Sequence, residues 1–148
     1  MEKTLIVYYS NSGMAERLAL HAKRLLPAAD IDRIGYAGRN FKRHSFISAI
    51  FKVPGAPDIE GDVHNPKDYQ QVTLVFPVWA GKPAPVMKEY VKKYAESMPD
   101  YNAVCVSGGE GSKSVEWLTE KIGRAPKEKL EVTSKTVDSD GYNLTGII

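Results

Sequence analysis

The fold is decided by the stretch Leu5–Ala15, LIVYYSNSGMA, in which five apolar residues run directly into a short, hydroxyl-rich turn. A continuous apolar run bounded by turn residues is typical of a strand that is buried on both faces of a sheet. Apolar residues at helical spacing follow the turn, at Met14, Leu18, Ala22, Leu25 and Leu26. The stretch therefore predicts a buried strand, a tight turn and the start of a helix.

The turn itself has two interpretations. Ser10, Ser12 and several unpaired backbone N–H groups would lie at the N-terminus of the helix, where the helix dipole is positive and a phosphate binds well. Alternatively, a serine caps the helix and the turn needs no ligand. Both interpretations stay open on this stretch alone.

Length and composition predict one domain, residues 1–148, with an ordinary globular balance of 43% hydrophobic and 26% charged residues. The net charge of +2 is too small to indicate a nucleic-acid partner. No apolar run approaches the roughly 20 residues of a membrane span, and no signal peptide is visible. The single cysteine, Cys105, fits a reducing compartment, so we expect a cytoplasmic protein.

Two further strands are each followed by a distinctive loop. Val72–Phe76 leads into Pro77–Pro85, which three prolines stiffen and which carries Trp79 at its tip. The indole ring of this tryptophan either packs into the core or presents its flat face to a flat ligand. Ala103–Val106 leads into Ser107–Ser112, where three glycines either let the backbone approach a ligand closely or form a flexible loop.

The other segments complete an alternation of strands and helices. Helices are predicted over 86–94 and 115–122, a weak edge strand over 30–36 and a half-covered strand over 132–137. Residues 37–71 form an irregular, initially basic section with a short amphipathic helix around Ile47, Ile50 and Phe51. The last residues form a turn-rich tail without a helical pattern.

No catalytic residue and no metal ligand is predicted. The segment Gly108–Ser114 is not a nucleotide P-loop, because Ser112 stands where the motif needs a glycine before the lysine. No dinucleotide fingerprint or nucleophile elbow occurs. His21, His44 and His64 are scattered, without metal-ligand spacing.

The alternation favours an open parallel sheet with helices on both faces. In such sheets ligands bind beyond the carboxyl ends of the strands, and all three special loops would open at that edge. One loop offers phosphate donors, one a tryptophan and one a glycine-rich backbone. Together they suit a flat aromatic ligand with a phosphate tail.

These loops resemble those of the flavodoxin family, and the resemblance runs over nearly the whole chain. Tyr9–Glu16 resembles the family's phosphate loop, Pro77–Pro83 the loop that packs on the flavin ring, and Ser107–Gly111 the second ring loop. The resemblance implies a five-stranded parallel sheet in the order 2-1-3-4-5, with helices on both faces, and bound FMN.

The same resemblance implies which residues bind the cofactor. Ser10, Asn11 and Ser12 and the N–H groups of Gly13–Ala15 would hold the phosphate, and Trp79 would stack on the isoalloxazine. The backbone around Ala80 and Gly81 would face N5 of the flavin. The implied cofactor-binding residues are Ser10, Asn11, Ser12, Gly13, Met14, Ala15, Pro77, Val78, Trp79, Ala80, Gly81, Lys82, Ser107, Gly108, Gly109 and Gly111.

The chain departs from the family pattern in three places. Ala15 stands where the family usually has threonine or serine, so one phosphate hydrogen bond worth about 1.5–3 kcal/mol is missing. Residues 107–111 include no aromatic side chain, so the ring would be covered on one face only. The family's last helix is absent after Val137, which leaves one sheet face under-covered and predicts a homodimer, a mobile tail or a truncated chain.

The resemblance implies a flavoprotein that transfers electrons between redox enzymes. Carriers of this family are usually acidic around the flavin, whereas this chain is mildly basic. The alternative is an NAD(P)H-dependent FMN or quinone reductase, in which Lys82 and the basic segment 39–52 attract an acidic cofactor or partner. A third interpretation is a module that has lost FMN and acts by protein contact, as Ala15 would allow. Whether the chain is an oxidoreductase in its own right stays open.

Overall fold

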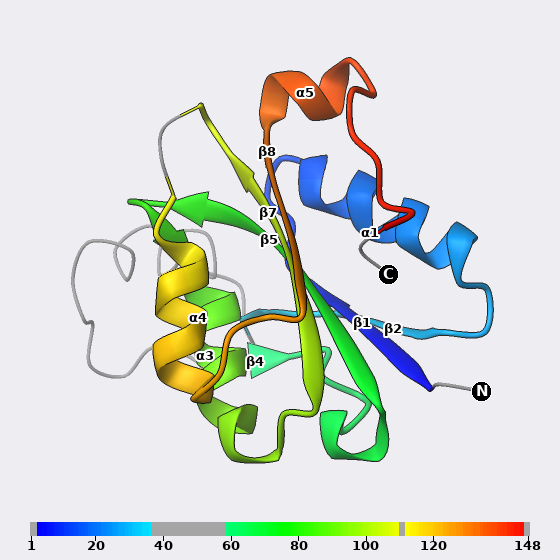
Figure 1. The fold of residues 1–148 in the computed structure, drawn as a ribbon, viewed down its shortest axis with the longest axis vertical. Coiled ribbons are helices and arrows are strands. Elements are labelled where there is room, and N and C mark those ends of the chain that lie inside the picture. Colours follow the sequence, from blue (N-terminus) through cyan, green and yellow to red (C-terminus); the bar gives the residue numbers. More distant parts are fainter. Residues whose placement is uncertain (1–2, 37–58, 110–111, 147–148) are drawn as a thin grey trace.

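Five parallel strands form the central sheet of the computed structural model, which describes residues 3–36, 59–109 and 112–146 (Figure 1). All neighbouring pairs along this sheet are parallel. When only these five strands are numbered along the chain, their order across the sheet is 2-1-3-4-5, so the predicted fold class is confirmed. Across the sheet the strands are β2 (Asp30–Arg33), β1 (Thr4–Tyr8), β5 (Gln71–Trp79), β7 (Asp100–Ser107) and β8 (Glu128–Thr133).

Two short antiparallel pairings lie beside this path. β6 (Lys82–Pro83) turns back on the end of β5. β3 (Gly35–Tyr36) pairs with β4 (Ile59–Glu60) in a separate two-stranded sheet. The predicted edge strand over 30–36 is therefore divided between two sheets, because pairing with β1 ends at Arg33.

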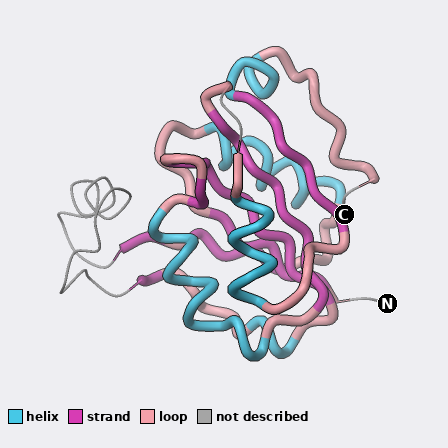
Figure 2. Tube along the Cα trace, turned by 60° about the vertical axis from the view of Figure 1, so that its left-hand side comes forward, coloured by secondary structure: helices cyan, strands magenta, loops and turns pink. Residues whose placement is uncertain are grey.

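Helices cover both faces of the sheet, as predicted (Figure 1, Figure 2). α1 (Met14–Leu25) and the short α5 (Ser134–Asp138) pack on one face. α3 (Pro85–Tyr94) and α4 (Ser114–Ile122) pack on the other. Two single 3-10 turns, η1 (Pro66–Asp68) and η2 (Ala95–Ser97), precede β5 and β7.

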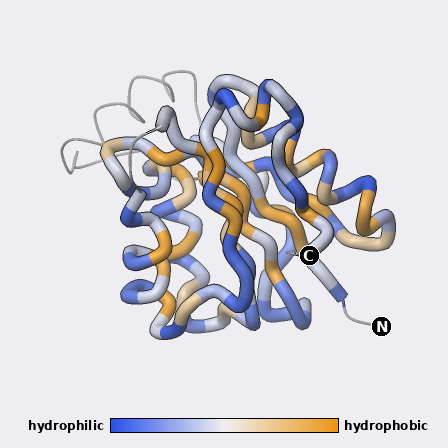
Figure 3. The backbone as a smooth tube through the Cα atoms, turned by 45° about the horizontal axis from the view of Figure 1, so that its top comes forward, coloured by the Kyte–Doolittle hydropathy of each residue, from blue (hydrophilic) through white to orange (hydrophobic). Residues whose placement is uncertain are grey.

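The strands bury side chains on both faces, which explains their continuous apolar sequences. In β1, Leu5 and Val7 join the core under α3 and α4, whereas Ile6 and Tyr8 join the core under α1. Figure 3 shows apolar stretches in the central strands, and apolar segments alternating with polar ones along the flanking helices. No helix of the described residues is long and apolar enough to cross a membrane.

The C-terminal region differs from the expectation. β8 ends at Thr133, and the strand predicted over 132–137 is wrong from Ser134 onward. The Thr133 hydroxyl oxygen accepts a hydrogen bond from the backbone N–H of Thr136 at 3.2 Å, which caps α5 and ends the strand. No full-length last helix follows α5 within the described residues, as the sequence predicted.

The tail nevertheless covers the sheet face that we expected to be under-covered. Leu144 is only 1% exposed and packs in the same core as α1. Arg17 binds Asp140 at 2.9 Å, and the rings of His21 and Tyr142 are in contact. The tail therefore covers part of the face that we expected to be under-covered, while the homodimer stays a prediction. The short helix expected around Ile47 lies outside the described residues.

Candidate functional site

The three loops singled out in the sequence begin at one edge of the sheet. They follow β1, β5 and β7, which are neighbouring parallel strands and therefore end on the same side (Figure 1). In open α/β sheets this carboxyl edge is where ligands bind. The structure thus brings together the loop segments that the sequence analysis combined, although Gly111 lies outside the described residues.

The first loop leaves the N-terminus of α1 open. The hydroxyl oxygen of Ser10 accepts a hydrogen bond from the N–H of Gly13 at 3.1 Å. Gly13 is the N-cap of α1 with φ 95°, and no side chain of the described residues caps this helix. Because the first N–H groups of a helix have no intrahelical partner, they are available to an anion. Asn11 and Ser12 are exposed beside them.

Ala15 faces the protein core. It is 2% exposed and belongs to the apolar cluster under α1, while Met14 before it is half-buried. At the position where the flavodoxin pattern has threonine or serine, Ala15 therefore offers no hydroxyl, and its methyl group packs against the core. The backbone N–H groups of Gly13–Ala15 are unaffected by this replacement.

The second loop, predicted over 77–85 as a loop that prolines stiffen, contains a β-hairpin. β5 continues to Trp79, and β6 pairs Lys82 with Trp79 and Pro83 with Val78. The two linking residues, Ala80 and Gly81, have φ of 54° and 76°. Positive φ at both positions is the conformation that closes a two-residue hairpin without splaying its strands.

Trp79 connects the first two loops. Its ring lies 6.0 Å from the ring of Tyr9, centroid to centroid, at an interplanar angle of 79°. The indole is half-buried and packs against the core under α3 and α4. The side chain therefore supports the core from the carboxyl edge, while its contact with a flat ligand stays a prediction.

A backbone hydrogen bond connects the third loop to the hairpin. The backbone N–H of Lys113 donates a hydrogen bond to the carbonyl oxygen of Gly81 at 2.7 Å. At the start of the loop, the hydroxyl oxygen of Ser107 accepts from the N–H of Gly109 at 3.4 Å. Gly108 and Gly109 are exposed, so their backbone is accessible at this edge.

Three charged or hydroxyl side chains meet beside the first loop, and none of them was among the residues predicted for the site. The carboxylate of Glu16 accepts hydrogen bonds from the Tyr8 hydroxyl at 3.2 Å and from the Arg33 guanidinium at 2.9 Å. Burial and the neighbouring carboxylate raise the pKa of Tyr8, which keeps its hydroxyl protonated as a donor. No sequence spacing links residues on two strands and a helix, although the β1–β2 pairing places Tyr8 opposite Arg33.

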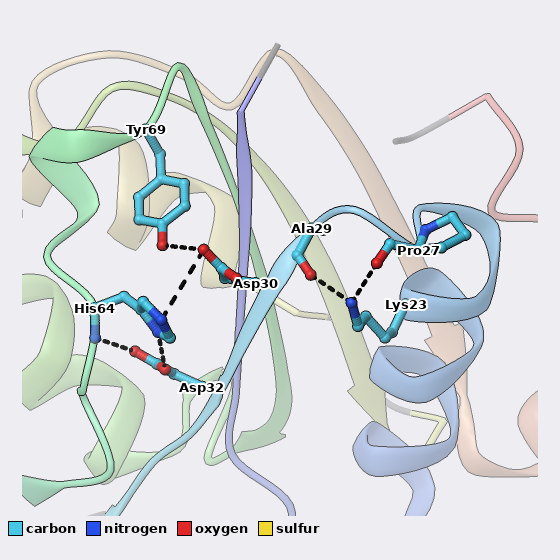
Figure 4. A network of polar contacts seen from close by, with 7 residues as sticks. All are labelled: Lys23, Pro27, Ala29, Asp30, Asp32, His64 and Tyr69. Carbon is cyan, nitrogen blue, oxygen red and sulfur yellow. Dashed lines mark hydrogen bonds and ion pairs between the residues drawn. The ribbon is translucent and has the colours of Figure 1, made fainter. Parts of the chain in front are cut away.

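A second polar network lies on β2 and the segment before β5 (Figure 4). Asp32 is 2% exposed and accepts from the backbone N–H of His64 at 2.9 Å, and its carboxylate lies 2.7 Å from His64 Nδ1. The Tyr69 hydroxyl donates to Asp30 at 2.5 Å. These contacts hold the segment before β5 against β2 and involve none of the three loops.

Within the described residues, no group of three or more acidic, histidine or cysteine side chains is placed to hold a metal ion.

Comparisons with known proteins agree with this architecture. No protein-family model and no curated protein sequence matches the chain. Among solved structures, a flavoprotein from Lactobacillus acidophilus in complex with FMN has a TM-score of 0.71 at 22% identity, over 96% of this chain and 100% of that one. A putative flavoprotein from Bacteroides eggerthii has a TM-score of 0.72 at 18% identity, over 99% and 98%.

A flavodoxin from the domain Archaea is similar at a TM-score of 0.55 and 16% identity, over 93% of this chain and 90% of that one. Likeness at these identities establishes the fold. The chain has a flavodoxin-like α/β fold, as the sequence resemblance implied.

Proposed function

We propose that this chain binds FMN at the carboxyl edge of β1, β5 and β7 and carries electrons between redox proteins. The observation that carries the proposal is the convergence of an uncapped helix N-terminus, a half-buried tryptophan and an exposed glycine backbone at one edge. The similar Lactobacillus acidophilus flavoprotein, which was crystallised with FMN, supports the choice of this cofactor.

The first loop fits a phosphate. Ser10 uses its oxygen to accept from Gly13, so its own O–H proton is available to an anion. The exposed Ser12 hydroxyl, the Asn11 amide and the first N–H groups of α1 add further donors. Hydrogen bonds to a charged group are worth about 1.5–3 kcal/mol, so these donors offset the hydroxyl that Ala15 lacks.

The second and third loops fit a flat ring. Trp79 supplies an aromatic surface on the hairpin, and Gly108 and Gly109 supply a backbone without side chains. FMN would contribute the redox chemistry of its ring when bound. The chain's own residues would bind the phosphate, orient the ring and exclude water from the Trp79 side. The exposed Lys82 would add positive charge beside the ring.

The alternative is an NAD(P)H-dependent reductase of a quinone or similar acceptor. The observation that favours it is the exposed Gly108–Gly109 backbone, which would leave one ring face open to a second flat substrate. A contact module without FMN is a third candidate, and the buried methyl of Ala15 supports it. For all three we propose a cytoplasmic location, which the single, buried thiol of Cys105 favours.

The test is a visible absorption spectrum of the purified protein with added FMN, followed by NADPH under anaerobic conditions. We expect a bound-flavin spectrum that NADPH alone leaves unchanged and that a separate reductase bleaches. Rapid bleaching by NADPH would instead support the reductase. The absence of any bound flavin would overturn both redox functions and support the contact module.

A further inference from the structure

Glu16 occupies the position of a capping residue but does not cap its helix. It is the third residue of α1, from which a glutamate commonly reaches back to the N–H of the N-cap residue. Here the N–H of the N-cap residue Gly13 is bound to the Ser10 hydroxyl oxygen at 3.1 Å. The Glu16 carboxylate is turned instead to the Tyr8 hydroxyl and the Arg33 guanidinium, at 3.2 and 2.9 Å.

The sheet fixes both partners of this carboxylate. Tyr8 ends β1 and Arg33 ends β2, and the two residues are paired in register. The Tyr8 side chain belongs to the buried core under α1, so its hydroxyl has a defined place. The Glu16 side chain is 34% exposed and the Arg33 side chain 62%. The carboxylate is therefore held at the sheet edge by one buried and one exposed partner.

An unheld carboxylate at this position would compete with a phosphate. The N-terminus of a helix attracts any nearby anion, including a side chain of the helix's own first turn. A carboxylate turned toward the open N–H groups would occupy the donors and repel a second negative charge. Arg17, the other charged residue of this turn, is already paired with Asp138 and Asp140.

We propose that Tyr8 and Arg33 hold the Glu16 carboxylate away from the N-terminus of α1 and thereby keep that N-terminus open for the phosphate of FMN. Arg33 is in this view a positioning residue, which acts on the ligand through Glu16. The inference rests on the proposed function, because it assigns a phosphate to the first loop.

The experiment compares FMN with riboflavin, which has the same ring and no phosphate. Dissociation constants are measured for the wild type, Arg33→Gln and the double variant Arg33→Gln/Glu16→Gln. Arg24→Gln is the matched control, since it removes the same charge about 15 Å along the helix from Met14. Circular dichroism verifies that each variant is folded.

We expect Arg33→Gln to weaken FMN binding roughly three- to tenfold and to leave riboflavin binding within twofold. Adding Glu16→Gln should restore FMN affinity, because the competing charge is gone. Arg24→Gln should stay within twofold of the wild type. An equal loss for both flavins, no loss at all, or a loss that Glu16→Gln does not restore overturns the inference.

A readout without flavin separates this inference from the proposed function. Inorganic phosphate is titrated into the ¹⁵N-labelled protein, and the amide signals of Met14, Ala15 and Glu16 are followed. We expect a saturable shift in the wild type, a weaker one in Arg33→Gln and recovery in the double variant. If the wild type binds no FMN, the proposed function fails, and this titration alone decides the inference. No phosphate response in the wild type, or equal responses in all variants, overturns it.

Discussion

The backbone N–H of Lys113 donates a hydrogen bond to the carbonyl oxygen of Gly81, with 2.7 Å between nitrogen and oxygen. This bond joins the tip of the β5–β6 hairpin to the residue that precedes α4. Residues on either side of the hairpin tip, Trp79 and Lys82, are therefore held in place by the sheet on one side and by α4 on the other. A fixed tip is what a ring-binding surface requires, and the first predictions concern these two side chains.

Replacing Trp79 with alanine should weaken FMN binding by about 1–3 kcal/mol, because the aromatic surface that the hairpin offers to the proposed ring site is lost. The change should be measured by titrating FMN and following the quenching of flavin fluorescence. Trp117→Ala is the control, since this second half-buried tryptophan lies in α4 and not on the hairpin. Unchanged FMN affinity in a folded Trp79→Ala protein would show that the ring binds elsewhere.

Replacing Lys82 with glutamate should lower the reduction potential of bound FMN by an amount on the order of tens of millivolts. Lys82 is exposed and paired with Trp79, so the substitution would place a negative charge beside the proposed ring site and disfavour the reduced anion. Potentiometric titration measures the effect, and Lys92→Glu on α3 provides the same charge change away from the hairpin. A potential that rises, or that shifts equally in the control, contradicts this placement of Lys82.

Replacing Ala80 with glycine should raise the free energy of unfolding by about 0.5–1 kcal/mol. Ala80 has φ 54°, a left-handed conformation that costs a side-chain-bearing residue about 1–2 kcal/mol and glycine much less. Ala95→Gly is a control of opposite sign, because Ala95 is right-handed helical and should lose stability. Urea denaturation measures both, and a destabilised Ala80→Gly would mean that the turn is not strained.

Three apolar runs, each followed by a distinct loop, predicted an open parallel sheet with helices on both faces. The strand order was implied by the resemblance to the flavodoxin family and not by these runs. The three prolines of residues 77–85 predicted a stiff loop and not a hairpin, because they do not indicate that the strand continues beyond Phe76. Proline lacks an N–H but keeps its carbonyl, and here the carbonyl of Pro77 accepts a hydrogen bond from Ala84 at 3.0 Å. The strand therefore continues through the proline to Trp79.

The contacts of the first loop could be predicted only in part. Ser10, Ser12 and Gly13 stand in a local pattern that indicates an open helix N-terminus. The Glu16–Arg33 pair depends on the pairing of β1 with β2, which brings together residues 17 positions apart that no local pattern connects. The burial of Leu144 in the tail could not be predicted for the same reason. It results from tertiary contacts, and no periodic pattern in the tail sequence indicates it.

Replacing Leu144 with alanine should destabilise the protein by about 2–5 kcal/mol, because it opens a cavity between the tail and the core under α1. Leu20→Ala on α1 is the control, since that side chain is 42% exposed and should cost less than about 1 kcal/mol. Both free energies of unfolding come from urea titrations. Equal, small effects would contradict the assignment of the tail as the cover of this sheet face.

Replacing Tyr69 with phenylalanine should destabilise the protein at neutral pH, by an amount that shrinks in acid. The Tyr69 hydroxyl donates to Asp30 at 2.5 Å and holds the pKa of that carboxyl below its ordinary value near 3.8. A carboxyl whose pKa is lowered by folding contributes stability above its unfolded pKa and loses it as the pH falls through the folded one. The substitution removes that contribution, so the difference in free energy of unfolding from the wild type should be full above about pH 5 and should narrow below pH 4.

Tyr101→Phe is the control, because the Tyr101 hydroxyl donates to the carbonyl of Arg124 at 2.8 Å, and a carbonyl does not titrate. Urea denaturation of the three proteins between pH 2 and pH 6 measures both differences, and a Tyr69→Phe difference as constant as that of Tyr101→Phe would contradict the link between Tyr69 and the ionisation of Asp30.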